Sequence, residues 1–161
     1  MNLFSSILFT FMFFLNQGLP EIREQYINAA DSKSNADKFY NLVIKNKEDN
    51  VVYLAYKGAA TALKSKFSTN KSEKKEMFIA GVTMVEKAIK NDPNNIEIRL
   101  IRLSIQENTP KILKYKSNIT EDKNIIISTF DRQSKDLKVY IKLYVKQSKV
   151  FTEEEKKTIN S

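Results

Sequence analysis

The hydrophobic positions of this chain recur at helical spacing along most of its length. Phe78, Val82, Val85 and Ile89 follow one another at intervals of four, three and four residues, which places them in one stripe on a single helix. Similar stripes occur in residues 51–67, 96–105 and 137–145. The pattern predicts an all-α chain of about seven or eight helices, joined by short loops as consecutive antiparallel hairpins.

The segment over residues 96–105 has a wider apolar surface than the others. Ile96, Leu100 and Leu103 form one stripe, and Ile98 and Ile101 extend it around the helix. A helix that is apolar on more than one side is normally buried on more than one side. We therefore expect this helix to be buried on two sides.

Polar residues at the ends of the stripes indicate where helices begin. Asn50 precedes one stripe, and the pairs Asn94 with Glu97 and Thr152 with Glu155 have the spacing of a capping box. In that motif the first side chain bonds the backbone of the third helical residue, and the acidic side chain bonds back. We expect helices to start at these three places.

Three further segments have weaker signals. Ser34 with Asp37 resembles a helix start, and Thr109 before a proline predicts a short helical turn that runs through Tyr115. Residues 125–127 are three consecutive isoleucines, which resemble a strand. Since the polar residues before them resemble a first helical turn, we predict that residues 125–127 are helical.

Gly58 and Gly81 lie inside strong helical patterns, although glycine destabilises a helix interior by about 1 kcal/mol relative to alanine. Each lies near alanine residues, so we expect both to mark a close approach between helices. Gly81 is followed by a large apolar residue, Val85, four positions later, by the small residue Ala88 after three more, and by Pro93 after a further five.

That spacing resembles the second helix of a tetratricopeptide repeat, and Leu54 and Gly58 resemble positions of its first helix. Residues 51–93 would then form a tetratricopeptide-like hairpin within a right-handed array. The resemblance implies a groove between helices that receives a peptide or protein segment. The whole chain is also similar to uncharacterised exported helical proteins of Gram-negative bacteria, which combine an export signal, such a hairpin and a segment like residues 97–108.

The first twenty residues differ from the rest of the chain. They have no charged side chain, and residues 3–15 are apolar except for two serines and one threonine. Such a run fits the apolar core of a secretory signal, about 7–15 residues long, and is short for a membrane span of about 20 residues. We predict a signal peptide over residues 1–18 and a single all-α domain over residues 21–161, located in the periplasm or on the cell surface. An uncleaved anchor is the alternative.

The chain has a formal net charge of +8, but 23 of its 27 basic residues are lysines. Arginine is the residue that reads phosphates and guanine edges with bidentate geometry, so we expect no specific nucleic-acid partner. Lysines recur along one expected helix and its end, at positions Lys135, Lys138, Lys142, Lys146 and Lys149. They form either an ordinary solvated helix face or a contact for an acidic partner or an anionic membrane surface.

The chain lacks histidine and cysteine entirely. This excludes serine–histidine triads, thiolate nucleophiles and the usual zinc sites. We predict no catalytic residue, no metal ligand and no cofactor. A hydrolase of the cell envelope that uses two carboxylates remains the enzymatic alternative, because such carboxylates need only meet in space.

Candidate binding residues come from two groups. Arg99 and Arg102 share a helix face in a lysine-biased chain and suggest recognition of a carboxylate or phosphate, with Gln106 farther along the same segment. The alternative for the two arginines is an internal ion pair with one of three acidic residues, namely Glu97, Glu107 or Glu86.

Tyrosines form the second group, because tyrosine is enriched at interfaces. Two lie on the helix over residues 51–67 and two on the helix over residues 137–145; they are Tyr53, Tyr56, Tyr140 and Tyr144. Their alternative role is to line the core. Together these features predict a binding or scaffolding module for a protein or peptide of the cell envelope.

Overall fold

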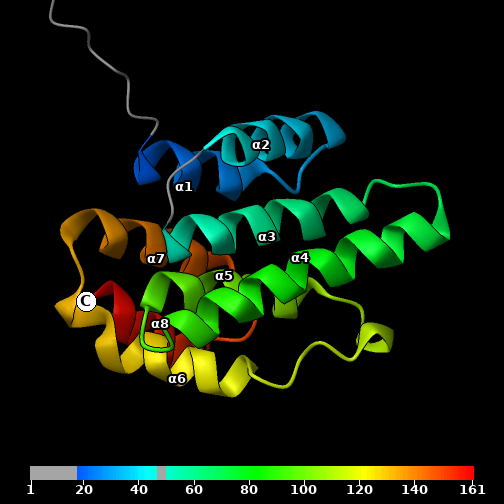
Figure 1. Ribbon diagram of the computed structural model, residues 1–161. Coiled ribbons are helices and arrows are strands. Elements are labelled where there is room, and N and C mark those ends of the chain that lie inside the picture. The colour runs from blue at the N-terminus through cyan, green and yellow to red at the C-terminus, as the bar shows by residue number, and fades with distance from the viewer. Residues whose placement is uncertain (1–17, 47–49) are drawn as a thin grey trace, which may run out of the picture.

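The structure, a computed structural model, describes residues 18–46 and 50–161. In this part of the chain all regular structure is helical (Figure 1). The eight α-helices are α1 (Leu19–Asn28), α2 (Lys33–Lys45), α3 (Val51–Ser65), α4 (Lys71–Asn91), α5 (Ile96–Asn108), α6 (Ile119–Thr129), α7 (Lys135–Gln147) and α8 (Glu153–Asn160), with 3₁₀ turns η1 (Lys111–Leu113) and η2 (Phe130–Arg132). The predicted all-α class is confirmed.

The helix starts follow the polar residues closely, with two corrections. The side chain of Asn50 accepts the amide of Val52, and Thr152 forms the predicted capping box with Glu155. The cap of α5 is Asn95 rather than Asn94, because the carboxamide of Asn95 is the one that accepts the first free amides of the helix.

The second correction concerns α2. Its cap is Ser32, whose hydroxyl accepts the amide of Asn35, and Ser34 lies inside the helix. The predicted turn after Pro110 is confirmed but ends at Leu113, since Lys114 adopts a left-handed conformation with φ of 50°. Residues 125–127 belong to α6 and are helical, as predicted.

Helices α3 and α4 lie side by side and touch at their two glycines (Figure 1). A Cβ atom added to Gly58 would lie 2.6 Å from the carbonyl oxygen of Gly81, and one added to Gly81 would collide with the backbone of Ala62. No side chain fits in that space. The expectation that both glycines mark a close approach between helices is confirmed.

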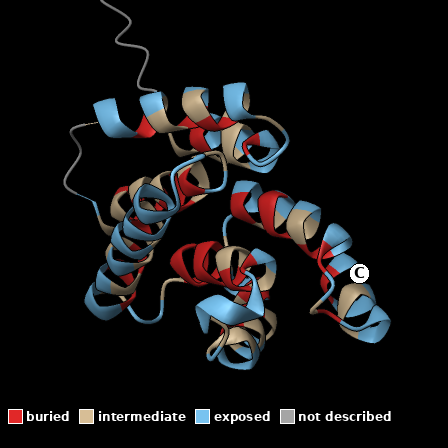
Figure 2. Cartoon of the chain, turned by 90° about the vertical axis from the view of Figure 1, so that its right-hand side faces the viewer, coloured by how far each residue is buried: buried red, intermediate tan, exposed pale blue. Residues whose placement is uncertain are grey.

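Two clusters of apolar side chains form the core, and α5 contributes to both. Ile98 and Ile101 pack with residues of α1 to α4, whereas Ile96, Leu100 and Leu103 pack with residues of α6, α7 and α8. The helix is therefore buried on two sides, as its wide apolar surface predicted. Figure 2 shows the buried residues on the facing sides of the helices.

The predicted signal peptide, residues 1–18, lies outside the described residues except for Gly18. Within the described part of the chain, none of the helices combines the length and the apolar character that crossing a membrane requires.

Candidate functional site

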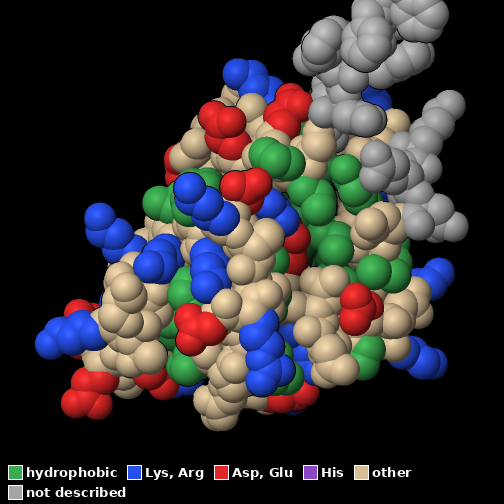
Figure 3. Space-filling view, turned by 90° about the vertical axis from the view of Figure 1, so that its left-hand side faces the viewer, with side chains coloured by type: hydrophobic (Ala, Val, Ile, Leu, Met, Phe, Trp, Pro, Cys, Tyr) green, Lys and Arg blue, Asp and Glu red, His purple; other side chains and the backbone are tan. Residues whose placement is uncertain are grey.

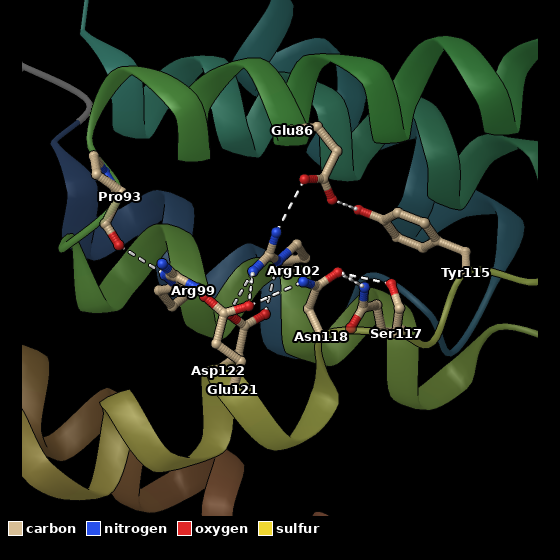
Figure 4. Close-up of polar contacts among 10 residues, drawn as sticks. Glu86, Pro93, Arg99, Arg102, Tyr115, Ser117, Asn118, Glu121 and Asp122 are labelled. Carbon is tan, nitrogen blue, oxygen red and sulfur yellow. Dashed lines mark hydrogen bonds and ion pairs between the residues drawn. The ribbon is translucent and has the colours of Figure 1, made fainter.

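Arg99 and Arg102 both face α6 and share one buried carboxylate, that of Asp122 (Figure 4). Arg99 Nη1 donates to Asp122 Oδ1 over 2.8 Å. Arg102 donates from Nε to Oδ2 over 2.8 Å and from Nη2 to Oδ1 over 2.7 Å. The side chain of Asp122 has no exposed surface. This three-residue cluster joins α5 to α6.

The cluster continues toward the surface through two further carboxylates. Arg99 Nη1 lies 2.6 Å from Glu121 Oε1, and Arg102 Nη1 lies 2.9 Å from Glu86 Oε2 on α4. The hydroxyl of Tyr115 donates to the other oxygen of Glu86. Burial by itself lowers the pKa of Arg102, but the hydrogen bonds and charges of Asp122 and Glu86 together outweigh it and raise the pKa. Against its burial, Asp122 and Glu121 raise the pKa of Arg99 in the same way, so both guanidiniums stay charged.

The internal ion pairing that the sequence left open is thus present, with one of the predicted partners and with two further carboxylates. Of the three acidic residues considered, Glu86 does pair with Arg102, whereas Glu97 pairs with Arg23 of α1. Asp122 was not among them. The only signal for it was its place in the first turn of α6, where an acidic residue is already explained by the helix dipole.

A second polar cluster fixes α1 to α5. Arg23 donates from Nε and Nη2 to the two oxygens of Glu97, over 2.8 and 2.7 Å, and the hydroxyl of Tyr56 donates to Glu97 Oε1 over 2.7 Å. Glu97 is almost fully buried, so these bonds compensate its desolvation. The hydroxyls of Tyr26 and Ser104 add a 2.6 Å bond between the same helices.

A third cluster ties the end of α7 to α5. Glu107 accepts hydrogen bonds from the hydroxyls of Tyr144 and Ser148, over 2.6 and 2.9 Å, and from the backbone amide of Lys149 over 2.6 Å. The backbone amide of Ser148, the residue that follows α7, donates to the carbonyl oxygen of Tyr144. The three clusters together lock α1, α6 and α7 onto α5.

The predicted binding residues therefore lie mostly in the interior. Six of the seven are buried, namely Tyr53, Tyr56, Arg99, Arg102, Gln106 and Tyr140, and Tyr144 is half-buried. Gln106 donates to Asn118 Oδ1 over 3.4 Å, while its Oε1 has no hydrogen-bond partner among the described residues. This placement gives the group a structural role. A binding role for these residues stays a prediction.

The outer face of α7, in contrast to these buried residues, is exposed to solvent. Val139 and Leu143, one turn apart, are 54% and 50% exposed. Lysines flank them, and Gln133, Lys135, Lys138, Val139 and Lys142 line an open hollow of about 470 Å³. We call the surface of Lys135, Lys138, Val139, Lys142, Leu143 and Lys146 the α7 face. Figure 1 shows the start of α7 at the left-hand edge, and Figure 3 shows basic and apolar side chains interspersed on that side.

Aromatic contacts hold two ammonium groups of the α7 face in place. Lys138 Nζ and Lys142 Nζ lie 5.4 and 5.7 Å from the centre of the Phe130 ring, which is within the range of a cation–π contact. Lys138 Nζ also lies 3.9 Å from Asp131 Oδ1. The face therefore presents positioned positive charge beside exposed apolar surface.

The chemistry available elsewhere is limited. Among residues 18–46 and 50–161, no group of acidic side chains is arranged to hold a metal ion. The buried or half-buried carboxylates of Glu86, Glu97, Glu107 and Asp122 are all bonded to arginine, tyrosine, serine or backbone donors. They hold helices together.

No family model matches this chain, and neither a curated protein nor a solved structure matches it.

Proposed function

We propose that the chain is a helical protein-interaction module that works outside the cytosol, in the periplasm or at the surface of a Gram-negative bacterium. The observation that carries the binding role is the α7 face, where half-exposed Val139 and Leu143 lie among lysines. Contiguous apolar surface rimmed by polar groups marks interaction sites. The inward polar groups, in contrast, are used to pair helices with one another.

The proposed scaffold is a tetratricopeptide-like hairpin formed by α3 and α4, within a right-handed array of antiparallel helices. Its support is the tight contact of Gly58 with Gly81, because small residues at fixed places allow the two helices of such a repeat to pack closely. A proline, Pro93, follows the end of α4 at Asn91, as it does after the second helix of the repeat. The connection over residues 66–70 is longer than the tight turn of the family.

The support for export is the apolar run over residues 3–15. Cell fractionation of the full-length chain with a carboxy-terminal tag tests it, together with sequencing of the amino terminus of the recovered protein. We expect the tagged chain outside the cytosol and a new amino terminus at Leu19, directly after Gly18. Recovery in the cytosol with Met1 intact would refute export.

Binding is tested in the source cells with a photo-crosslinking amino acid in place of one exposed residue. Leu143 on α7 and Ile79 on α4 are a matched pair, because both side chains are 50% exposed. We expect a reproducible protein adduct at position 143. Absence of any protein adduct at both positions, combined with hydrolysis of cell-wall glycan or peptide by the purified chain, would replace the binding role with the enzymatic alternative.

A further inference from the structure

We infer that the partner of the α7 face is an acidic amphipathic helix of another protein. This inference rests on the proposed function and specifies the partner of the same surface. The juxtaposition that carries it is an apolar pair one helical turn apart, a neighbouring hollow, and a row of lysines along one side of the pair.

The charge of the α7 face lacks compensation within the described chain. Of its four lysines, only Lys138 lies within 4.0 Å of a carboxylate there, and that carboxylate belongs to Asp131, whose side chain is 98% exposed. Lys142 donates to the backbone carbonyl of Asn160 instead. A partner that presents carboxylates would supply the missing counter-charges, and complementary charges raise the rate and specificity of association.

The apolar positions fit a helix better than an extended segment. Val139 and Leu143 are four residues apart on α7, so they form one short ridge. Apolar residues at the same spacing on a second helix could pack along that ridge, as in other complexes that recognise an amphipathic helix. Glutamates along the flank of the partner helix that lies over the lysines would then face them.

The hollow beside Val139 favours a protein over a lipid surface. The hollow is open rather than enclosed, so a side chain that protrudes from the partner can lie against Val139 and the lysines that line it. A membrane surface offers no such side chain. Asp131 and Asp136 are also exposed near the start of α7, where they would face the negative charge of an anionic bilayer. Carboxylates of a protein partner can be placed to avoid them.

The test uses protein purified from cells that express the full sequence, and a fluorescent synthetic helical peptide as the probe. The peptide has two leucines four residues apart with glutamates on both flanks, and binding is followed by fluorescence anisotropy. We expect saturable binding that weakens at least tenfold for Lys138→Glu with Lys142→Glu, and also for Val139→Ser with Leu143→Ser.

Two controls separate this face from general electrostatic attraction. Lys75→Glu with Lys87→Glu makes the same change of net charge at exposed positions of α4 and should leave the affinity within twofold. A second peptide with lysine in place of every glutamate should not bind. We expect every variant to fold, because all substituted side chains are at least partly exposed. Circular dichroism checks this for each of them.

Three outcomes would overturn the inference. They are absence of peptide binding, equal binding of the lysine peptide, and equal loss in the α4 control. Binding of phosphatidylglycerol vesicles that depends on the α7 face, without peptide binding, would identify a membrane as the partner instead. A protein adduct at position 143 in cells alongside any of these results would leave the proposed binding role standing while this partner chemistry fails.

Discussion

Removing the charge of Asp122 is expected to destabilise the protein strongly, although the substitution itself is conservative. Asparagine has nearly the same shape, but it leaves Arg99 and Arg102, both almost fully buried, without the carboxylate that they share. Breaking a buried ion pair from one side destabilises a protein by about 3–5 kcal/mol, because the remaining charge stays desolvated. Glu121 and Glu86 are half-exposed and recover only part of that loss.

A loss of about 3–5 kcal/mol is a large part of the total stability of a domain, which is about 5–15 kcal/mol. At about 2–4 °C per kcal/mol for a chain of this size, Asp122→Asn should lower Tm by roughly 6–20 °C. Urea unfolding followed by circular dichroism measures the free energy of unfolding directly. The matched control is Asp131→Asn, since Asp131 is 98% exposed and its removal should change stability by less than about 0.5 kcal/mol.

The same reasoning predicts a rescue. Replacing the whole cluster by Arg99→Met, Arg102→Met and Asp122→Leu removes the three buried charges of this cluster at once, and such replacements are often neutral or stabilising. The triple variant should therefore be more stable than Asp122→Asn alone. If the free energy of unfolding of Asp122→Asn lies within about 1 kcal/mol of that of the parent chain, the cluster does not hold α6 in the way described.

For three other perturbations the structure predicts the direction of the change in stability. Gly81→Ala forces a Cβ atom into the backbone of Ala62 and should destabilise the chain by more than the gain of about 1 kcal/mol that alanine gives in an open helix, which urea unfolding measures. Bonds from Asn118 and then Arg99 lower the pKa of Glu121, and Lys123 lowers that of Glu155, below the ordinary 4.5. Their stabilising contribution is therefore complete above pH 4.5 and is lost as the pH falls through the lowered values, which urea unfolding at a series of acidic pH values should show. Burial raises the pKa of Tyr26 from 10.0 to about 12, so the stability it contributes is complete below pH 10 and is lost as the pH rises through about 12. Tyrosinate absorbance and circular dichroism should change together in that range, and ionisation of every tyrosine near pH 10 in the folded chain would contradict it.

Local rules were enough to predict the helices. The stripe from Phe78 to Ile89 and the cap at Asn50 depend on residues a few positions apart, and both predictions agree with the structure. The two-sided burial of α5 was also predictable, since its apolar residues surround most of the helix. Where two asparagines are adjacent, at Asn94 and Asn95, the spacing rule selected the wrong one because either could reach a free amide.

The partners of the buried charges were harder to predict. Arg99 and Asp122 are 23 residues apart, and an acidic residue in the first turn of α6 has a sufficient local explanation. Arg23 and Glu97 are 74 residues apart, and nothing near either of them indicates the other. The pairing of such residues depends on how the helices pack. The sequence indicates their chemistry but not their neighbours.

The bidentate bond between Arg23 and Glu97 sets a boundary for any processing of the amino terminus. Arg23 follows Gly18 by only five positions, and it is the arginine that neutralises the carboxylate of Glu97 in the interior. A protease that cuts at Gly18 leaves the pair intact. Removal of the chain through Arg23 would leave the buried carboxylate of Glu97 without its counter-charge between α1 and α5, so this pair limits how far into α1 any such processing can extend.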